Sequence, residues 1–327
     1  MRKPMIRRTL ISALFLTLPL SSQVCAQQKI DLTREQRLVV IDSITSALNR
    51  GYVFPEVATR MAADLRARFA KGEFDNLSDG SEFAQTLTTD LQAISHDKHL
   101  RVRVRADNPS SGPAGSFGVN TNIFGKTERM PGDIAYVQIL SFIQPPDSIL
   151  REETTRVMSA MADAKALIID LRTNGGGSPF TVALVSSYLF GSDPVHLNSL
   201  YFRPANRTDD FYTDPTVTGR KFGPDKPIYV LTSSRTFSGA EEFAYNLQTR
   251  KRATIVGETT GGGANPGRGF PLPYNLTVFV PTGRAINPIT KTNWEGVGVK
   301  PDVAVDADRA LDVALGLARG EKRPATQ

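Results

Sequence analysis

The sequence predicts an α/β protein in which a helical N-terminal unit precedes an open α/β core. Two observations predict this fold class. Apolar residues first recur at helical spacing, and then continuous runs of Val, Ile and Leu alternate with further helical patterns. The chain has 327 residues, 40% hydrophobic and 22% charged, enough to bury one large core or two smaller ones. This composition excludes disordered and collagen-like proteins.

The first 26 residues have the pattern of a secretory signal peptide. A basic start, MRKPMIRR, precedes the apolar run TLISALFLTLPL, and small residues surround the expected cleavage point after Ala26. We therefore expect export, to the periplasm in a bacterial cell. A retained N-terminal anchor is the alternative, and no later run reaches the roughly 20 apolar residues of a spanning helix.

Loss of residues 1–26 changes the charge and the thiol chemistry of the mature chain. Four basic side chains leave with this segment, so the formal charge falls from +6 to +2. The basic isoelectric point therefore gives no reason to expect a nucleic-acid partner. The only cysteine, Cys25, also lies in this segment. Without it the mature chain has neither disulfides nor a thiol nucleophile.

Three helical patterns predict the N-terminal unit, residues 27–100. Thr33 and Gln36 have the spacing of a capping box at the start of the first helix. The second helix follows Pro55, and the third begins near Ser81.

From Arg101 the hydrophobic period changes to two, which predicts a strand, and residues 108–115 (NPSSGPAG) predict a loop or hinge. Beyond it we expect strands over residues 134–139, 166–170, 227–231, 253–256 and 274–280, and helices over residues 150–164, 180–190 and 310–318 and after Ser238. Residues 196–226 are polar and predict a long connecting loop, functional or mobile. Whether this loop is a lid cannot be read from the sequence.

Three consecutive glycines, Gly175 to Gly177, follow a predicted buried strand and precede a helix. Such a segment lets backbone N–H groups face an anion at a helix N-terminus. Its spacing is that of neither a dinucleotide-binding loop nor a phosphate-binding P-loop. An oxyanion hole and a tight structural turn both remain open.

Ser238 and Glu241 have capping-box spacing at the head of an apolar-periodic run. A serine followed by Gly239 at a helix start is also how a nucleophile is presented. Glu295 lies in the turn WEGVGVKPD, where a glutamate is ordinarily solvated. These residues alone leave a structural and a catalytic interpretation open.

Histidine is scarce in this chain. His196 is most simply a surface residue, whereas His96 and His99 lie at the junction between the helical unit and the core. Histidines three residues apart could bind a metal, but no third ligand follows at matching spacing, so we do not expect zinc.

Four motifs, DLRTNGGG, YVLTSSRTFSGAEEFA, ATIVGETTGGGANPG and WEGVGVKPD, occur in this order. Together they resemble the serine peptidases of the carboxy-terminal processing, tricorn-core and interphotoreceptor-retinoid-binding-protein-like superfamily, over about residues 100–317. The resemblance implies a crotonase/ClpP-like core of ββα units over residues 101–327, preceded by that family's N-terminal helical domain. It also implies cleavage of peptides through an acyl-enzyme, with no metal or organic cofactor. By the same resemblance Ser238 is the nucleophile, and the N–H groups of Gly175, Gly176 and Gly239 form the oxyanion hole.

One position distinguishes the two branches of that superfamily. The processing branch has a lysine base 25 residues after the serine, where this chain has Gly263. Too few residues precede the core for the PDZ module of that branch. Resemblance to the tricorn-like branch implies that His99 is the base and Glu295 its partner. Lys98 stands where the tricorn core has a serine, and Ser95 is a candidate substitute.

Three functions are compatible with these features. An exported serine peptidase acting on unfolded peptides or protein C-termini is favoured, because Ser238, His99 and Glu295 are all present. A non-catalytic protein that binds lipids or retinoid-like ligands on the same fold is the alternative. A crotonase-type acyl-CoA enzyme is disfavoured by export to a compartment poor in acyl-CoA. The oligomeric state cannot be read from the sequence.

Overall fold

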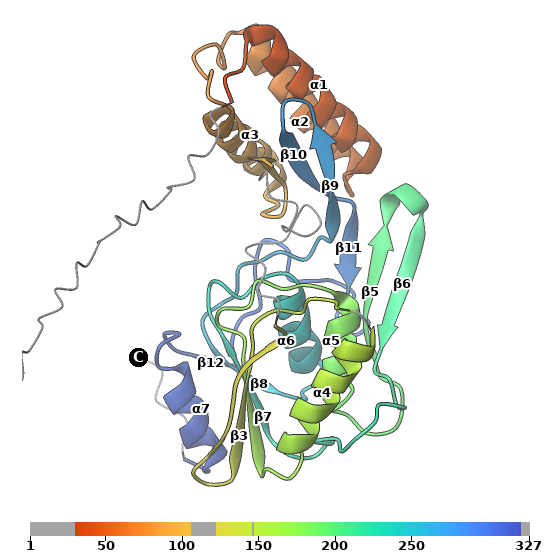
Figure 1. Cartoon of the computed structure of the whole chain (residues 1–327), viewed down its shortest axis with the longest axis vertical. Coiled ribbons are helices and arrows are strands. Elements are labelled where there is room, and N and C mark those ends of the chain that lie inside the picture. Colours follow the sequence, from red (N-terminus) through yellow and green to blue (C-terminus); the bar gives the residue numbers. More distant parts are fainter. Residues whose placement is uncertain (1–29, 106–121, 146, 322–327) are drawn as a thin grey trace, which may run out of the picture.

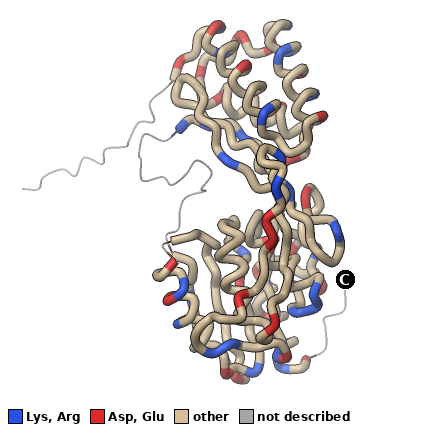
Figure 2. The backbone as a smooth tube through the Cα atoms, turned by 90° about the vertical axis from the view of Figure 1, so that its right-hand side faces the viewer, with Lys and Arg blue, Asp and Glu red and all other residues tan. Residues whose placement is uncertain are grey.

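The computed structural model describes residues 30–105, 122–145 and 147–321, which form two bodies joined at a narrow waist (Figure 1). The predicted signal peptide and the predicted loop over residues 108–115 lie outside the described residues. Basic and acidic residues are interspersed along the chain in both bodies (Figure 2). Within the described part of the chain, none of the helices combines the length and the apolarity needed to span a bilayer.

The smaller unit, which we call the helical body, combines three helices with a three-stranded antiparallel sheet. Its elements are α1 (Arg34–Gly51), α2 (Pro55–Ala70), α3 (Gly80–Ser95), β1 (Arg101–Val104), β9 (Gly267–Leu272) and β10 (Leu276–Pro281), with strand order β1-β10-β9. The predicted capping box of α1 is confirmed. The Thr33 N–H donates to Gln36 Oε1 at 2.9 Å, and the Gln36 N–H donates to Thr33 Oγ1 at 3.3 Å.

The hydrophobic core of the helical body crosses the boundary that the sequence predicts at residue 100. Ile41 and Leu87 from the helices pack in one cluster with Val102 of β1 and Val278 of β10. Strands β9 and β10 therefore return to the helical body about 170 residues after the end of α3. This return brings the first third of the chain against the segments that follow Ser238.

The larger unit, which we call the sheet body, is built on a six-stranded sheet of order β12-β8-β7-β4-β3-β2. Adjacent strands in this sheet run parallel to one another, except for β2 and β3, which are antiparallel. Its strands are β2 (Phe124–Met130), β3 (Ile134–Ile139), β4 (Ala166–Asp170), β7 (Ile228–Thr232), β8 (Thr254–Gly257) and β12 (Val303–Ala304).

Helices cover both faces of this sheet (Figure 1). One face carries α4 (Asp147–Met161), α5 (Pro179–Ser186) and α6 (Gly239–Thr249), and the other carries α7 (Ala310–Ala318). Ile169 of β4 packs in the cluster with α4 to α6, and its neighbour Ile168 packs in the cluster with α7. Because both faces are covered, β4 is buried throughout and reads as a continuous apolar run. The predicted α/β fold with N-terminal helices is confirmed.

The expectation of a loop throughout residues 196–226 is wrong for its first half. The chain forms β5 (His196–Phe202), a 3₁₀ turn η1 (Arg203–Ala205) and β6 (Arg207–Tyr212). These strands make an antiparallel sheet of order β11-β5-β6 with β11 (Gly283–Ile286). β5 pairs with β6 across the short η1 turn and with β11 some 80 residues later, and only the second pairing lies beyond the reach of a local pattern.

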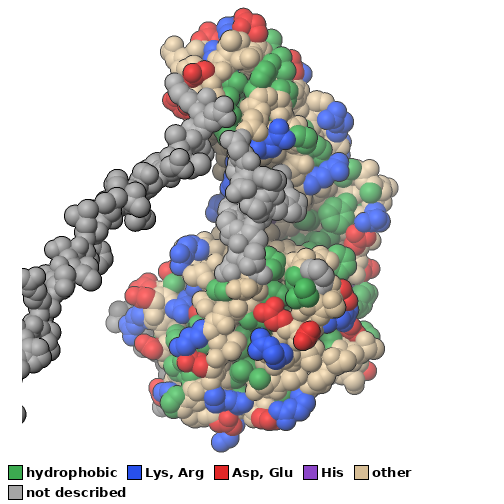
Figure 3. Space-filling model, viewed as in Figure 1, with side chains coloured by type: hydrophobic (Ala, Val, Ile, Leu, Met, Phe, Trp, Pro, Cys, Tyr) green, Lys and Arg blue, Asp and Glu red, His purple; other side chains and the backbone are tan. Residues whose placement is uncertain are grey.

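The η1 turn also ties the two bodies together. The Arg203 guanidinium donates to the Asn49 and Tyr52 carbonyl oxygens at the end of α1, at 3.1 and 2.9 Å. Helix C-termini leave carbonyl groups without intrahelical partners, and arginine satisfies them here. On the face shown in Figure 3, hydrophobic side chains lie on both bodies beside the region where they join.

Candidate active site

Ser238 lies between the carboxyl end of β7 and the first turn of α6. Its backbone has φ 55° and ψ −121°, a combination that costs a non-glycine residue about 1–3 kcal/mol. Neighbouring hydrogen bonds maintain this conformation. The Ser238 N–H donates to Glu241 Oε2 at 2.8 Å, and the Ser238 carbonyl accepts from the Glu242 N–H at 2.9 Å. The Glu241 side of the predicted capping interaction is therefore present.

Glu241 does more than cap the helix, because its buried carboxylate also holds the glycine-rich loop over residues 257–264. Oε1 accepts from Thr260 Oγ1 at 2.5 Å and from the Gly262 N–H at 2.6 Å. Oε2, which accepts from Ser238, also accepts from the Gly263 N–H at 2.8 Å. Burial raises the pKa of Glu241, and these donors act in the opposite direction. One carboxylate thus fixes the position of this loop relative to Ser238.

The loop of three glycines before α5 packs directly on the Ser238 turn. Gly176 has φ 107°, and a Cβ there would lie 2.7 Å from the Gly239 nitrogen and from Ser238 Cβ. Only glycine permits this approach. The Gly176 N–H donates to Asn174 Oδ1 at 2.8 Å, so it cannot serve as the predicted oxyanion donor while that bond is made. Among the described residues, the Gly175 and Gly239 N–H groups have no acceptor.

His99 reaches this turn from the helical body, where it lies between α3 and β1. Its ring packs against Phe237 and Phe279, with centroid separations of 4.6 and 6.0 Å. The imidazole Cε1 lies 2.7 Å from the point that a Cβ on Gly263 would occupy. His99 therefore fills the space into which a side chain at position 263 would extend.

The His99 ring is neutral at physiological pH. The residue is only 6% exposed, and this burial lowers its pKa to about 3. The exposed Lys98 side chain beside it donates from Nζ to the Gly261 carbonyl oxygen at 2.6 Å. A neutral imidazole has one free nitrogen lone pair and can accept a proton.

Two carboxyl groups lie beside His99. Asp97 is 1% exposed, and its Oδ1 accepts from the His99 N–H at 3.0 Å and lies 3.9 Å from His99 Nδ1. Its Oδ2 accepts from Asn265 Nδ2 at 2.9 Å and from the Tyr52 hydroxyl at 3.4 Å. Burial raises the pKa of Asp97, whereas these donors favour its charged form.

Glu295 supplies the second carboxyl group. Its Oε2 accepts from the Ala264 N–H at 2.5 Å, and its Oε1 is buried without a partner among the described residues. Burial, followed by the charge of Asp97, raises the Glu295 pKa to about 8. One ligand atom from each of Asp97, His99 and Glu295 lies within 4.8 Å of the others. At neutral pH Glu295 is therefore mainly protonated.

The structure brings the sequence-predicted residues together to different degrees. His99 and Glu295 lie in one cluster, and His99 contacts Phe237, the residue before Ser238. Ser95, the candidate substitute for the tricorn serine, instead accepts the Asp97 N–H at 3.2 Å.

The remaining histidines lie on other elements. His96 is the exposed C-cap of α3. His196 is half-buried on β5, where it stacks on Tyr212 at 4.5 Å.

Asp97 was missed by sequence reasoning, although its position two residues before His99 is a usable signal for a turn that orients the histidine.

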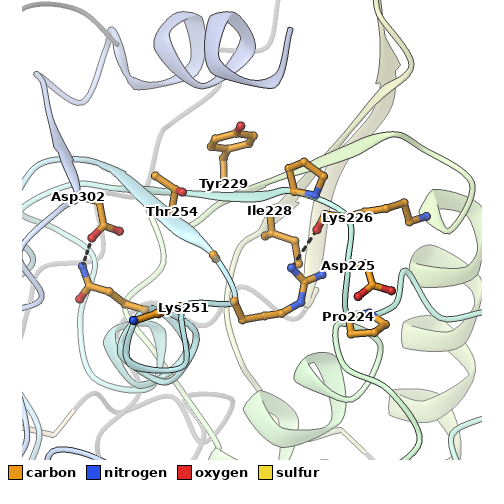
Figure 4. Close-up of a pocket in the computed structure, with 12 residues that line it drawn as sticks. Pro224, Asp225, Lys226, Ile228, Tyr229, Lys251, Thr254 and Asp302 are labelled. Atoms are coloured by element: carbon orange, nitrogen blue, oxygen red, sulfur yellow. Dashed lines mark hydrogen bonds between the residues drawn. The ribbon is translucent and has the colours of Figure 1, made fainter. Parts of the chain in front are cut away.

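A polar pocket elsewhere in the sheet body is separate from this cluster (Figure 4). It is lined by residues at the amino ends of β7 and β8, whereas Ser238 follows the carboxyl end of β7. The Arg252 guanidinium in it donates to the carbonyl oxygens of Leu189, Gly223 and Lys226. These bonds indicate a structural role for the only arginine in its lining.

Comparisons with known proteins agree with the motifs. Peptidase family S41 matches residues 133–305, and the N-terminal domain of peptidase family S41 in eukaryotic IRBP matches residues 24–130. A carboxy-terminal-processing protease of Bartonella bacilliformis is 27% identical over 196 residues, which cover 58% of this chain and 43% of that protein. The chloroplastic carboxyl-terminal-processing peptidase 2 of Arabidopsis thaliana is 30% identical over 172 residues, 52% of this chain and 31% of that protein. The matches therefore span less than half the length of these two relatives.

Solved structures share the fold. A peptidase-like structure from Parabacteroides merdae superposes with a TM-score of 0.60 at 18% identity, covering 91% of this chain and all of that chain. The tricorn protease superposes with a TM-score of 0.56 at 13% identity, covering 89% of this chain and 36% of that chain. At such identities the likeness concerns the fold alone. The sequence match over residues 133–305 covers more than half of the chain, and by this match the chain belongs to peptidase family S41.

Proposed function

We propose that this chain is an exported serine peptidase in which Ser238 is the nucleophile and His99 the general base. The observation that carries the proposal is the packing of a buried, neutral His99 against Phe237 and Gly263, beside the strained Ser238 turn. A hydroxyl is a weak nucleophile at neutral pH and needs a positioned base. A serine at a backbone outlier fits that requirement when a buried imidazole packs on the preceding residue and two carboxyl groups lie beside that imidazole.

The reaction follows the acyl-transfer scheme. Ser238 Oγ attacks the scissile carbonyl carbon while His99 takes the hydroxyl proton, and the protonated imidazole returns that proton to the leaving amine. The resulting acyl-enzyme is hydrolysed by water, again with His99 as base. The Gly239 and Gly175 N–H groups, which lack acceptors among the described residues, stabilise the oxyanion. Each such donor contributes about 3–4 kcal/mol in other serine hydrolases.

The two carboxyl groups have different roles in this proposal. Asp97 accepts more hydrogen bonds and carries the negative charge that stabilises the imidazolium. Glu295, largely protonated, completes the network and holds the loop at Ala264. Asp97→Asn should then lower kcat/KM about 10²- to 10⁴-fold, the range of a positioned acid–base group, and Glu295→Gln much less. An equal loss in both variants would contradict this division of roles.

The substrate is a peptide or an unfolded protein cleaved near its C-terminus. This part of the proposal rests on relatives named carboxy-terminal-processing and tail-specific proteases, the latter from Haemophilus influenzae and 32% identical over 139 residues. Export and a periplasmic location rest on the pattern of residues 1–26. Mass spectrometry of the secreted or periplasmic chain should find a mature N-terminus at Gln27; a chain that keeps Met1 in the cytoplasm would contradict export.

A fluorophosphonate probe tests the nucleophile. The wild-type chain lacking residues 1–26 should be labelled at Ser238, with labelling lost in Ser238→Ala and strongly reduced in His99→Ala. His96→Asn is a matched control, because His96 is exposed, has φ 57°, and asparagine tolerates that conformation. Peptide products from a denatured protein, read by mass spectrometry, would then give the cleavage preference.

Two outcomes would overturn the proposal. Labelling that survives Ser238→Ala would remove Ser238 as the nucleophile. If the wild-type chain is inert to the probe and to peptides, yet binds apolar fluorescent ligands, a binding function on the peptidase fold should replace the peptidase.

A further inference from the structure

We propose that Asp97, His99 and Glu295 form a binding site for one divalent transition-metal ion, such as Zn²⁺, and that the bound ion prevents His99 from acting as the general base. The three side chains each place one ligand atom within 4.8 Å of the others. Glu295 lies almost 200 residues after His99, so the sequence spacing typical of zinc ligands is absent. Only the packing of the two bodies brings them together.

Two of the ligand atoms lack partners. Within the described residues, His99 Nδ1 and Glu295 Oε1 are buried and make no hydrogen bond. His99 Nδ1 lies 3.9 Å from Asp97 Oδ1, which is too long for a hydrogen bond. Buried polar atoms normally pair with protein groups, water or an ion, so these two atoms are available to a ligand. Neither atom has to give up a bond in order to bind a metal.

The local charge also favours a cation. Two carboxyl groups beside a neutral imidazole carry up to two negative charges, and like charges at this distance cannot both persist without compensation. The Lys98 ammonium donates to the Gly261 carbonyl, and the Arg101 guanidinium donates to the carbonyls of His99 and Lys98. The charge of Arg101 still reaches His99 and Asp97, so it offsets part of the negative charge of the two carboxyl groups. A proton on Glu295 is one form of compensation, and a divalent ion that displaces this proton is another.

The donor set selects the kind of metal. One imidazole nitrogen with two carboxylate oxygens suits Zn²⁺, Co²⁺ or Mn²⁺, whereas Mg²⁺ and Ca²⁺ prefer oxygen alone. Three protein ligands and one open position are the arrangement of an accessible zinc site. Zinc–ligand bonds of about 2.0–2.2 Å place ligand atoms roughly 3.4 Å apart in a tetrahedron. Displacements of the ligand atoms by about an ångström, through side-chain rotation, would therefore bring all three within bonding distance of one ion.

Binding at Nδ1 has a direct consequence for the proposed base. A neutral imidazole that gives its Nδ1 lone pair to a metal carries its proton on Nε2. His99 in that form has no lone pair left to take the Ser238 proton, so the metal-bound chain would be inactive. This inhibitory part depends on the proposed function, whereas metal binding itself does not.

The binding test uses the Ser238→Ala chain, because it needs no activity. The chain is stripped with a chelator and titrated with Zn²⁺ by calorimetry, and then with Co²⁺ by visible absorption. One ion per chain is expected. His99→Ala and Glu295→Gln, each added to Ser238→Ala, should weaken binding by more than the roughly 10- to 100-fold typical of outer-shell partners. The control His96→Asn should bind as the parent does, and thermal melts check that every variant is folded.

Each result decides between the alternatives. Absence of saturable one-to-one binding, or binding unchanged in both ligand variants, overturns the site. If the site binds Zn²⁺ but the active wild-type chain keeps its peptidase rate with the site filled, the inhibitory role is overturned. A rate that falls with Zn²⁺ occupancy and returns on chelation supports it. A chain that binds Zn²⁺ but never cleaves peptides would contradict the proposed function and leave the site standing.

Discussion

Gly263→Ala tests whether the packing of His99 controls activity. Gly263 is not among the residues with positive φ, so alanine meets no backbone strain there, and only steric contact changes. The added Cβ would lie 2.5 Å from Phe237 Cε2 and 2.7 Å from His99 Cε1. Carbon atoms in contact prefer about 3.5–4.0 Å, so both rings must move, each by roughly 1 Å.

The expected effect follows from this displacement. Overpacking of this kind costs about 1–3 kcal/mol of folding free energy, or about 2–4 °C in Tm for each kcal/mol. A shift of about 1 Å in a catalytic group can lower the rate about 100-fold. The mutant should thus melt slightly earlier and lose about two orders of magnitude in kcat, measured with a fluorogenic peptide and by calorimetry.

Gly191→Ala is the matched control, because no atom lies within 4 Å of its added Cβ and its φ is not positive. It should retain both Tm and activity. A Gly263→Ala chain with kcat and Tm equal to those of wild type would refute the reasoning, since it would mean that His99 and Phe237 are not held against position 263.

Three further predictions follow from the same geometry. Glu241 accepts hydrogen bonds from four donors, and Glu241→Gln replaces one of its oxygens by an NH₂ group that cannot accept them. The free energy of unfolding should therefore fall by about 1–3 kcal/mol for each donor left unpaired. A chemical unfolding curve that matches wild type would contradict this. Because burial raises the Glu295 pKa to about 8, the folded state holds a proton that the unfolded state has released, and stability should fall as pH rises from about 4.5 to 8. Glu295→Gln should flatten that slope in melts at pH 5 to 8, whereas parallel curves would show that Glu295 titrates normally. Ser238→Gly should be about 1 kcal/mol more stable than Ser238→Ala, because the strain that glycine relieves at φ 55° exceeds its larger entropic cost of folding. The reverse order in denaturant melts would show that the turn is unstrained.

Local sequence patterns predict those elements that can be recognised from their own residues alone. β4 is covered on both faces by helices, so its first four residues, Ala166 to Ile169, form one apolar run before Asp170, and its bounds match the prediction at residues 166–170. The α1 capping box likewise needs only residues three apart. β5 was missed within a polar segment, although its hairpin partner β6 follows directly after the η1 turn; only its second partner, β11, lies some 80 residues later, outside any local pattern.

The candidate site also has features that local spacing predicts and features that it does not. The cap at Ser238 follows from spacing, whereas the pairing of His99 with Glu295 was reached only through resemblance to a family. Asp97 illustrates what a one-dimensional pattern omits. Its carboxylate is buried because Tyr52 from the end of α1 and Asn265 from the loop before β9 both donate to it. No sequence period records a contact made between two bodies.

The hydrogen bonds of Glu241 make a helix-capping role for this turn compatible with the proposed role of Ser238 as nucleophile. A cap needs only the bond that the Ser238 N–H donates to Glu241 Oε2, but the same oxygen also accepts from the Gly263 N–H, and His99 packs against Gly263. The carboxylate that starts α6 therefore also sets the distance between the Ser238 turn and the base. Helix capping and catalysis are consequently not alternative uses of this segment. A substitution at Glu241 should lower kcat even under conditions in which the chain remains fully folded, because it releases the loop that holds His99 near Ser238.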